Sequence, residues 1–284
     1  GTVQNYFTVA TEWTNIQEAL ELDQLKEILA PMARRIVTDL ELDLGSYMFK
    51  NCNLHYGTPG TVVDAWSDVA GAGALMDSVG IPTNGDRYYV MNPFTTTNLA
   101  VAQGALNASD GLVRTAWEKS QISSNFGGLR ALTSNALASY TSGTASDRAG
   151  TLSGSPDVTY VTAKDTMTQV LAVTAFSASA TIKAGEIITI TGRNRLNLST
   201  RETMLNASGA AIIFAGTVTE DVTLNGSGAG NVTVAGAAIY EANGQYNTTA
   251  TAATSGDVVT LLGSASTLYQ PNMFYHEQAF GVGT

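Results

Sequence analysis

The sequence predicts an α+β protein in which a β-rich domain is inserted into a domain of helices and strands. Apolar residues recur at helical spacing through the first 130 residues or so. From residue 131 to 265, short β-branched runs alternate with Gly, Ser and Asn clusters. The last segment, LYQPNMFYHEQAFGVGT, turns aromatic again and resembles residues 86–94 more than the β block. Because the last segment resembles residues 86–94 and not the β block, we interpret residues 131–265 as an insertion and not as a tail.

The first helical signal covers residues 24–49. Its apolar residues are spaced by three and four, at Leu25, Ile28, Leu29, Met32, Ile36, Leu40, Leu44 and Tyr47. Pro31 has no backbone N–H and is tolerated best in the first turn of a helix. We therefore expect a short helix that ends before Pro31 and a second helix, about five turns long, that begins there.

Residues 61–80 carry a second helical signal, with Thr61 as its expected N-cap and Gly80 as its expected end. The expected apolar face consists of Val62, Ala65, Trp66, Val69 and Met76. Gly71 and Gly73 lie inside this pattern. They either weaken the helix or let another segment pack closely against it.

An aromatic strand, residues 87–91, follows in the stretch DRYYVMNPFTTTNLA. Tyr88 and Tyr89 are expected on opposite faces of this strand. Asn92 can cap a short helix that Pro93 begins, and residues 112–122 could form one more helix. Every residue here has a folding role, so the stretch is interpreted as scaffolding and not as an active site.

In the β block, strands are expected at the β-branched runs 158–162, 170–176, 186–191, 211–214, 231–234 and 257–262. Short strands at even spacing, separated by turn residues, indicate an antiparallel barrel or a sandwich. The string GSGAG at residues 226–230 precedes a strand and not a helix, so it predicts a hairpin turn and no phosphate-binding loop.

Composition limits the function classes. Hydrophobic residues make up 44% and charged residues 13% of the chain, against roughly 25% charged in an ordinary domain. Such a surface either meets other protein or belongs to a β-rich protein with a Thr/Ser exterior. The net charge is −10 and the chain shows no cluster of Lys and Arg, which argues against direct binding to nucleic acid.

Other features bear on the cellular context. No apolar run approaches 18 residues and no signal peptide is visible, so no membrane association is expected. The one cysteine, Cys52, excludes an internal disulfide and fits production in a reducing cytoplasm. The first residue is Gly and not Met, so a trimmed chain is expected.

The candidates for catalysis are few. His55 and His276 are the only histidines, they lie far apart in sequence, and with one cysteine they cannot form a structural zinc site. No GxSxG elbow is present. The acids of residues 18–27 and 39–43 are interpreted as solvated helix faces. We therefore predict no catalytic residue, no cofactor site and no metal site.

The order of motifs resembles a known family. A long amphipathic helix is followed by TVVDAWSDVAGAGALMDS, DRYYVMNP and SSNFGGLRALTSNALASYTSGT. TIKAGEIITITG lies within the β block, and QPNMFYHEQAF lies near the end. Together, over residues 24–284, these segments resemble the P22-like major capsid (coat) proteins of tailed phages, which have the HK97-type fold with an inserted six-stranded β-barrel domain.

The resemblance implies a division of the chain. Residues 1–60 would form an N-terminal segment and the spine helix of a peripheral domain. Residues 61–132 and 264–284 would form the axial and peripheral shell domain, and residues 133–263 the inserted barrel, which would aid folding and contact neighbouring subunits. Such a coat protein would also have a longer N-terminal arm and would continue beyond Thr284.

The function that follows is structural and not enzymatic. The resemblance implies a major capsid subunit of a tailed phage or prophage that assembles into an icosahedral shell around DNA. Its partners would be copies of itself, in pentamers and hexamers, and a scaffolding protein. It would be made in the bacterial host cytoplasm and reside in the virion. The alternative is a β-rich surface adhesion or carbohydrate-binding module, whose Thr/Ser/Asn surface would suit a glycan.

Overall fold

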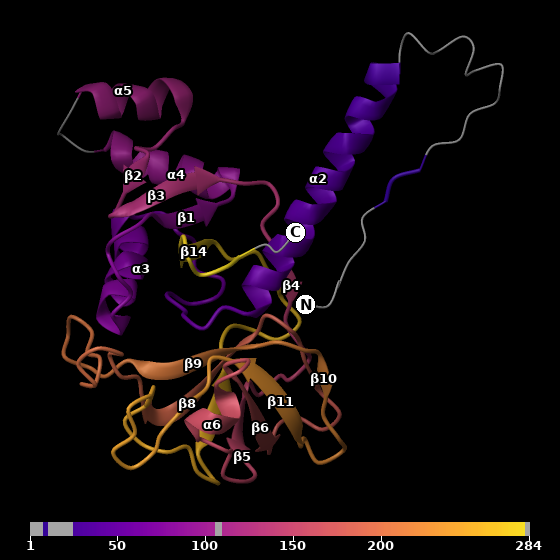
Figure 1. Ribbon diagram of the computed structural model, residues 1–284, viewed down its shortest axis with the longest axis vertical. Coiled ribbons are helices and arrows are strands. Elements are labelled where there is room, and N and C mark those ends of the chain that lie inside the picture. Colours follow the sequence, from indigo (N-terminus) through magenta and orange to yellow (C-terminus); the bar gives the residue numbers. More distant parts are fainter. Residues whose placement is uncertain (1–7, 11–24, 106–109, 282–284) are drawn as a thin grey trace.

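The computed structural model describes residues 8–10, 25–105 and 110–281 of the chain. It is a mixed α+β structure with a four-stranded sheet, a closed six-stranded barrel and one long helix. Figure 1 shows the barrel at one end of the molecule and the sheet with its helices at the other, while the long helix projects away from both. The expected α+β class with an antiparallel β-barrel is confirmed.

The long helix α2 covers Leu25–Lys50 without a break, and Pro31 lies inside it. The prediction of two helices that meet at Pro31 was therefore wrong. A proline inside a helix removes one backbone hydrogen bond. Here that loss lies within the first two turns, so the hydrogen-bond ladder along the rest of the helix is uninterrupted.

Helix α3 covers Trp66–Val79 and begins later than expected. Thr61 does not cap it. Instead Asp68 reaches back from the first turn, and its carboxylate accepts a hydrogen bond of 3.1 Å from the backbone N–H of Ala65. Gly80 ends the helix in the left-handed conformation, with φ of 94°, as expected.

The buried face of α3 differs from the predicted one. Val69 and Met76 are buried as expected, but Val62 and Trp66 are 61% and 58% exposed. The two glycines allow close packing. A Cβ on Gly71 would collide with the Tyr56 ring, and one on Gly73 would lie 3.3 Å from the carbonyl oxygen of Gly127.

The four-stranded sheet combines strands that precede the barrel with one that follows it. Its strands are β1 (Arg87–Met91), β2 (Asn125–Phe126), β3 (Leu129–Thr133) and β14 (Met273–His276). Their order is β14-β1-β3-β2, with β1 antiparallel to β14 and parallel to β3. Tyr88 lies opposite Tyr275. The return of the last aromatic segment to the first sheet is therefore confirmed.

Helices α4 (Pro93–Gly104) and α5 (Asp110–Lys119) form an antiparallel pair beside this sheet. Asn92 caps α4 as predicted, because its side-chain oxygen accepts a 2.7 Å hydrogen bond from the N–H of Thr95. Leu99 packs α4 onto the sheet residues Tyr89 and Met91. Gln103 joins the two helices through a 3.0 Å hydrogen bond to the carbonyl of Leu112.

The chain enters and leaves the β-rich part through a two-stranded ribbon. Strand β4 (Tyr140–Thr141) pairs antiparallel with β13 (Leu268–Tyr269). Beyond the strands, the N–H of Ser142 donates to the carbonyl of Thr267, and the N–H of Ser266 donates to the carbonyl of Gly143, each at 3.0 Å. The two connections therefore lie side by side.

The barrel is closed and antiparallel, so the sandwich alternative is excluded. Its strands, in sequence order, are β5 (Ala149–Leu152), β6 (Thr168–Thr174), β8 (Ile187–Asn194), β9 (Ile213–Val218), β11 (Gly230–Ala235) and β12 (Val258–Leu261). Around the barrel they are ordered β11-β6-β5-β12-β8-β9, and β11 pairs again with β9. Alternate residues of β6 are buried, as the two-residue period of a strand requires.

Two predicted strands need correction. Residues 158–162 form a loop and the short helix α6 (Tyr160–Ala163). The run at residues 211–214 is displaced, because β9 begins only at Ile213. The remaining elements, β7 (Thr181–Ile182) and β10 (Val222–Thr223), pair outside the barrel. The string GSGAG connects β10 to the start of β11, but these two strands pair with other strands, so the predicted hairpin is not formed.

A buried ion pair lies where the ribbon meets the barrel. Glu186 is 0% exposed, and its carboxylate accepts hydrogen bonds from Arg148 at 2.7 Å and from the N–H groups of Gly143 and Lys183. Arg148 also donates to the carbonyls of Leu262 and Gly263. The pair therefore links the segment that enters the barrel to the segment that leaves it.

A second ion pair makes barrel stability depend on pH. Arg193 binds both carboxylate oxygens of Asp257, at 2.7 and 2.6 Å. Burial alone would raise the pKa of Asp257, but Arg193 and the N–H of Thr254 together hold this pKa below its usual value. A carboxyl group whose pKa is lowered by folding stabilises the fold above its unfolded pKa, about 3.9, and loses that contribution as pH falls through the folded pKa.

We expect Asp257→Asn to lower the free energy of unfolding by about 1.5–3 kcal/mol at pH 7, the range for a hydrogen bond to a charged group. The difference from the unsubstituted chain should shrink as pH falls below about 3.9, because the unfolded chain then binds a proton at Asp257 while the folded protein still holds the ionised carboxylate. Urea denaturation at pH 7 and at pH 3 measures the difference in the free energy of unfolding at each pH. Asp165→Asn, at an exposed position of the same domain, is the control. An undiminished difference at pH 3 would contradict the assignment.

Candidate assembly surfaces

The two histidines lie in separate structural settings. His276 is buried at the end of β14, where its Nε2 lies 3.0 Å from the carbonyl of Asn84 and its Nδ1 accepts from the N–H of Gln278. His55 lies 2.6 Å from the carbonyl of Gly57, and burial lowers its pKa. Both rings are held by backbone groups of turns, which is a structural use of the side chain.

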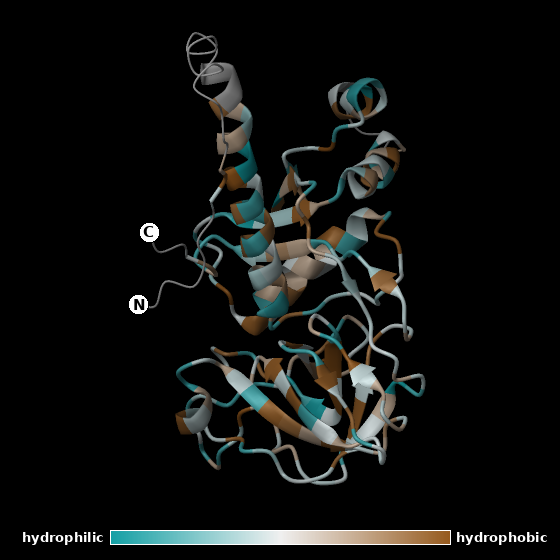
Figure 2. Ribbon diagram, turned by 90° about the vertical axis from the view of Figure 1, so that its right-hand side faces the viewer, coloured by the Kyte–Doolittle hydropathy of each residue, from teal (hydrophilic) through white to brown (hydrophobic). Residues whose placement is uncertain are grey.

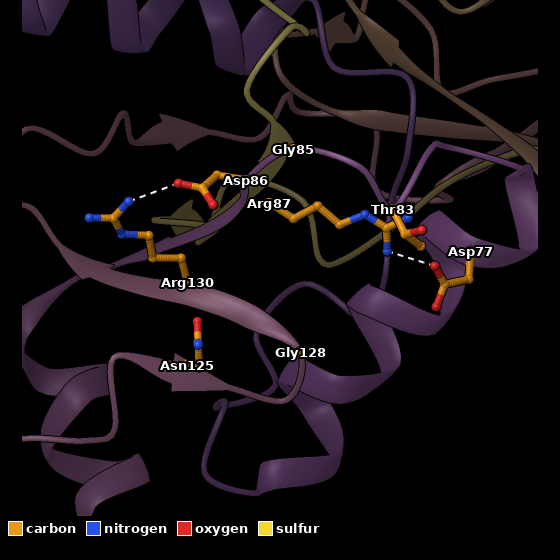
Figure 3. Close-up of a pocket in the computed structure, with 8 residues that line it drawn as sticks. All are labelled: Asp77, Thr83, Gly85, Asp86, Arg87, Asn125, Gly128 and Arg130. Atoms are coloured by element: carbon orange, nitrogen blue, oxygen red, sulfur yellow. Dashed lines mark hydrogen bonds and ion pairs between the residues drawn. The ribbon is translucent and has the colours of Figure 1, made fainter.

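A polar depression lies between β1, β3 and the end of α3 (Figure 3). Its volume is about 290 Å³, and its lining includes two arginines and two aspartates. Each arginine is paired: Arg87 binds Asp77 at 2.6 Å and Arg130 binds Asp86 at 2.8 Å. Figure 3 shows the two pairs pointing in different directions rather than converging on one point. This arrangement joins the strands to α3 and offers no unpaired charge to a ligand.

Within residues 8–10, 25–105 and 110–281, no group of three or more His, Cys, Asp or Glu side chains could hold a metal ion. Across the same residues, no helix has both the length and the apolar character needed to cross a bilayer.

The barrel is fixed to the rest of the molecule at several points. The Phe49 ring of α2 packs against Tyr140, with ring centroids 5.3 Å apart, and occupies the space where a Cβ on Gly185 would lie. From the loop that follows β8, Arg195 donates to the carbonyl of Asn53 at 2.8 Å. Asn197 donates to the carbonyl of Ser78 at the end of α3. The barrel region is therefore in contact with α2, with the segment after α2 and with the end of α3, in addition to its chain connections.

Helix α2 leaves apolar side chains uncovered. Leu29, Ile36 and Leu40 follow the helical spacing of the predicted apolar face, yet they are 43%, 36% and 43% exposed. Figure 2 shows hydrophobic and hydrophilic residues mixed along the helix, whose upper part stands clear of the sheet and the barrel. Near its other end α2 is covered, because the segment at Ala136 crosses it at Gly45. The exposed part is one candidate contact surface.

The tip formed by α4 and α5 is a second candidate. Phe94, Val101 and Trp117 are 82%, 71% and 89% exposed, more than any other large hydrophobic side chain of the described residues. Large hydrophobic groups that are exposed together often mark a protein–protein contact. Both surfaces are therefore candidates for contact with another protein.

Sequence reasoning missed the tip because apolar residues at helical spacing are normally assigned to a core. Ala116 of α5 is buried in this way, but the neighbouring Trp117 is not. The short segment DGLVRTAWEK offers more apolar surface than one contact with α4 can cover. A comparison of the number of apolar residues in α5 with the number that one helix–helix contact can bury could have revealed this excess.

The comparisons with known proteins agree with an assembly role. A family described as P22 coat protein, gene protein 5, matches residues 1–284. A protein called major capsid protein, from Acyrthosiphon pisum secondary endosymbiont phage 1, is 42% identical over 287 aligned positions, which cover 100% of this chain and 67% of that protein. The chain therefore belongs to the P22 coat protein family.

Proposed function

We propose that this chain is a major capsid subunit of a tailed phage or prophage. The observation that carries the proposal is the family match, which extends over the whole chain from residue 1 to 284. The adhesive alternative drew only on the Thr/Ser/Asn surface of the β block and has no such support. The subunit assembles with copies of itself into an icosahedral shell around DNA. Its role is structural and not catalytic.

The arrangement of elements supports an HK97-type fold. In this proposal α2 is the spine helix of the peripheral domain, which includes residues 1–60. Residues 61–132 and 264–284 form the shell domain, with its axial part built on the sheet β14-β1-β3-β2. Residues 133–263 form the inserted domain, since the strands of the closed barrel all lie between Ala149 and Leu261. The ribbon β4–β13 lies near the proposed boundary between the two.

Shell building needs complementary surfaces and no chemistry. Head-to-tail contacts that close on themselves give rings, which here would be pentamers and hexamers. The favourable free energy of each contact only slightly exceeds the entropic cost of association. A stable shell therefore depends on many contacts that act together. A scaffolding protein made with the subunit in the bacterial cytoplasm would guide curvature, and the finished subunit would reside in the virion.

The test is assembly itself. We expect the chain, produced alone or together with a scaffolding protein, to form closed shells. Negative-stain electron microscopy and sedimentation velocity would detect them. If only monomers form over a wide range of salt, crowding agent and protein concentration, with and without the scaffolding protein, the proposal is wrong.

A further inference from the structure

Three asparagines of the chain are each followed by glycine: Asn84, Asn225 and Asn243. An Asn-Gly pair is prone to lose the side-chain amide, because glycine has no side chain to keep its backbone nitrogen away from the asparagine side chain. That nitrogen can attack the side-chain carbon Cγ. All three asparagines are exposed, so any difference in their reactivity depends on how the fold holds the two reacting groups.

The side chain of Asn225 is held in place. Its Oδ1 accepts hydrogen bonds from the N–H groups of Ser227 and Ala229, each at 2.9 Å, and from the hydroxyl of Ser227 at 2.8 Å. Three hydrogen bonds to one oxygen fix the orientation of the attached Cγ. This carbon cannot turn toward the nitrogen of Gly226 until the bonds break, so the fold protects Asn225.

At Asn243 the fold holds the attacking group instead. The N–H of Gly244 donates to the carbonyl of Glu241 at 2.9 Å and closes a turn. Asn243 lies inside this turn in the left-handed conformation, with φ of 61°. The nitrogen of Gly244 must lose its proton to attack Cγ, and the turn keeps that proton in a hydrogen bond. The fold therefore protects Asn243 as well.

Neither protection is present at Asn84. In the described part of the chain, nothing forms a hydrogen bond with the Asn84 side chain or with the N–H of Gly85. The loop at residues 82–86 is exposed, and its residues Thr83 and Gly85 line the polar depression of Figure 3. Both reacting groups are therefore free, and water reaches them.

The fold also requires glycine after Asn84. A Cβ on Gly85 would collide with the carboxylate of Glu277, and Gly85 has φ of 101°. The backbone beside it is fixed, because Nε2 of His276 lies 3.0 Å from the carbonyl oxygen of Asn84. Nδ1 of His276 accepts from the N–H of Gln278, so Nε2 is the donor. The reactive pair is therefore built into the contact between this loop and β14.

We propose that Asn84 is the site at which the folded subunit spontaneously loses a side-chain amide. The nitrogen of Gly85 bonds to Cγ of Asn84, the bond from Cγ to the side-chain nitrogen breaks, and that nitrogen leaves as ammonia with the proton from Gly85. One water molecule then opens the resulting succinimide ring at either carbonyl and gives aspartate or isoaspartate. The inference concerns the subunit itself and does not depend on the proposed function.

The isoaspartate product changes the contact with β14. In isoaspartate the main chain runs through Cγ, and the former backbone carbonyl of Asn84 becomes a free carboxylate. The group that accepts the hydrogen bond from His276 then carries a negative charge, and the main chain before Gly85 is one carbon longer. The reaction therefore alters the link between the loop that precedes β1 and the strand that pairs with β1.

The test compares the three sites within one chain. The purified protein is incubated in mildly alkaline buffer, in one sample folded and in another unfolded in urea. Trypsin releases Asn84 in the peptide that ends at Arg87, and endoproteinase Glu-C separates Asn225 from Asn243 by cleavage after Glu241. Mass spectrometry measures the mass increase at each site from loss of ammonia and gain of water. Protein isoaspartate methyltransferase labels the isoaspartate product.

In urea the three sites should react at similar rates, because each is followed by glycine and none is held by structure. In the folded protein Asn84 should react several-fold faster than either Asn225 or Asn243. Asn84→Gln is the matched control, since its longer side chain must close a larger ring, which is much slower. It should remove the fast site and leave the other two rates unchanged. If Asn84 reacts no faster than Asn225 or Asn243 in the folded protein, the proposal is wrong.

Discussion

Glu186→Ala is expected to lower the free energy of unfolding by about 3–5 kcal/mol, the cost of leaving one partner of a buried ion pair without the other. Glu186 has no exposed surface, and Arg148 is only 12% exposed. Without the carboxylate, the Arg148 charge remains buried and the N–H groups of Gly143 and Lys183 lose their acceptor. Urea denaturation followed by circular dichroism measures the loss.

Two companion variants sharpen this prediction. Removing both charges, in Arg148→Met/Glu186→Leu, should recover much of the stability, because no uncompensated charge is left in the interior. Lys183→Ala removes an ion pair with Asp221 in which both side chains are about half exposed. It should cost less than about 1 kcal/mol. The buried-pair interpretation would be contradicted if Glu186→Ala and Lys183→Ala had equal effects.

The second large effect is expected at Gly228, in the turn between β10 and β11. A Cβ added to Gly228 would collide with the backbone carbonyl of Phe176, which cannot move aside as a side-chain end could. Gly228 also has φ of 70°, a conformation that costs an L-residue about 1–2 kcal/mol. We therefore expect Gly228→Ala to destabilise the protein by more than about 2 kcal/mol.

Gly226 supplies the control from the same turn. A Cβ there would meet nothing within 4 Å. Gly226→Ala should therefore be neutral or stabilise the protein by up to about 1 kcal/mol, since alanine restricts the unfolded chain. Thermal unfolding of both variants distinguishes the positions. Similar melting temperatures for Gly228→Ala and Gly226→Ala would show that the close approach of Phe176 is unimportant.

Features with a local cause could be predicted from the sequence. Asn92 followed by Pro93 combines a capping side chain with a fixed φ, and α4 begins there as expected. The β-branched runs around Val170 and Val232 became barrel strands because their alternation places every second residue in the core. Closure of the barrel depends on the pairing of β9 with β11 and of β8 with β12, which no local pattern specifies.

The incorrect predictions have identifiable competing interactions. The run at residues 158–162 has the composition of a strand, but Asp157 binds the N–H of Thr159 and the hydroxyl of Thr162 and turns the chain. Tyr160 then stacks on Tyr246, with ring centroids 4.1 Å apart. Thr61 had the right residue type for a cap, but Asp68 supplies the hydrogen bond from inside the first turn of α3.

The exposure of Phe94, Val101 and Trp117 was not predicted, for a different reason. Helical spacing shows which residues share a face, but not whether another element covers that face. Trp66 and Trp117 both follow an apolar helical pattern and both are exposed. For a protein whose surfaces meet other copies, the pattern alone does not distinguish a core inside one subunit from a contact between two.

The ribbon β4–β13 has a consequence for evolution and engineering. Because its two strands are hydrogen-bonded neighbours, the guest domain begins and ends at nearly the same place. A different folded module whose termini are adjacent should therefore fit between β4 and β13 without displacing these two strands. Replacement of the segment between β4 and β13 by another folded module should therefore leave the four-stranded sheet and its helices intact.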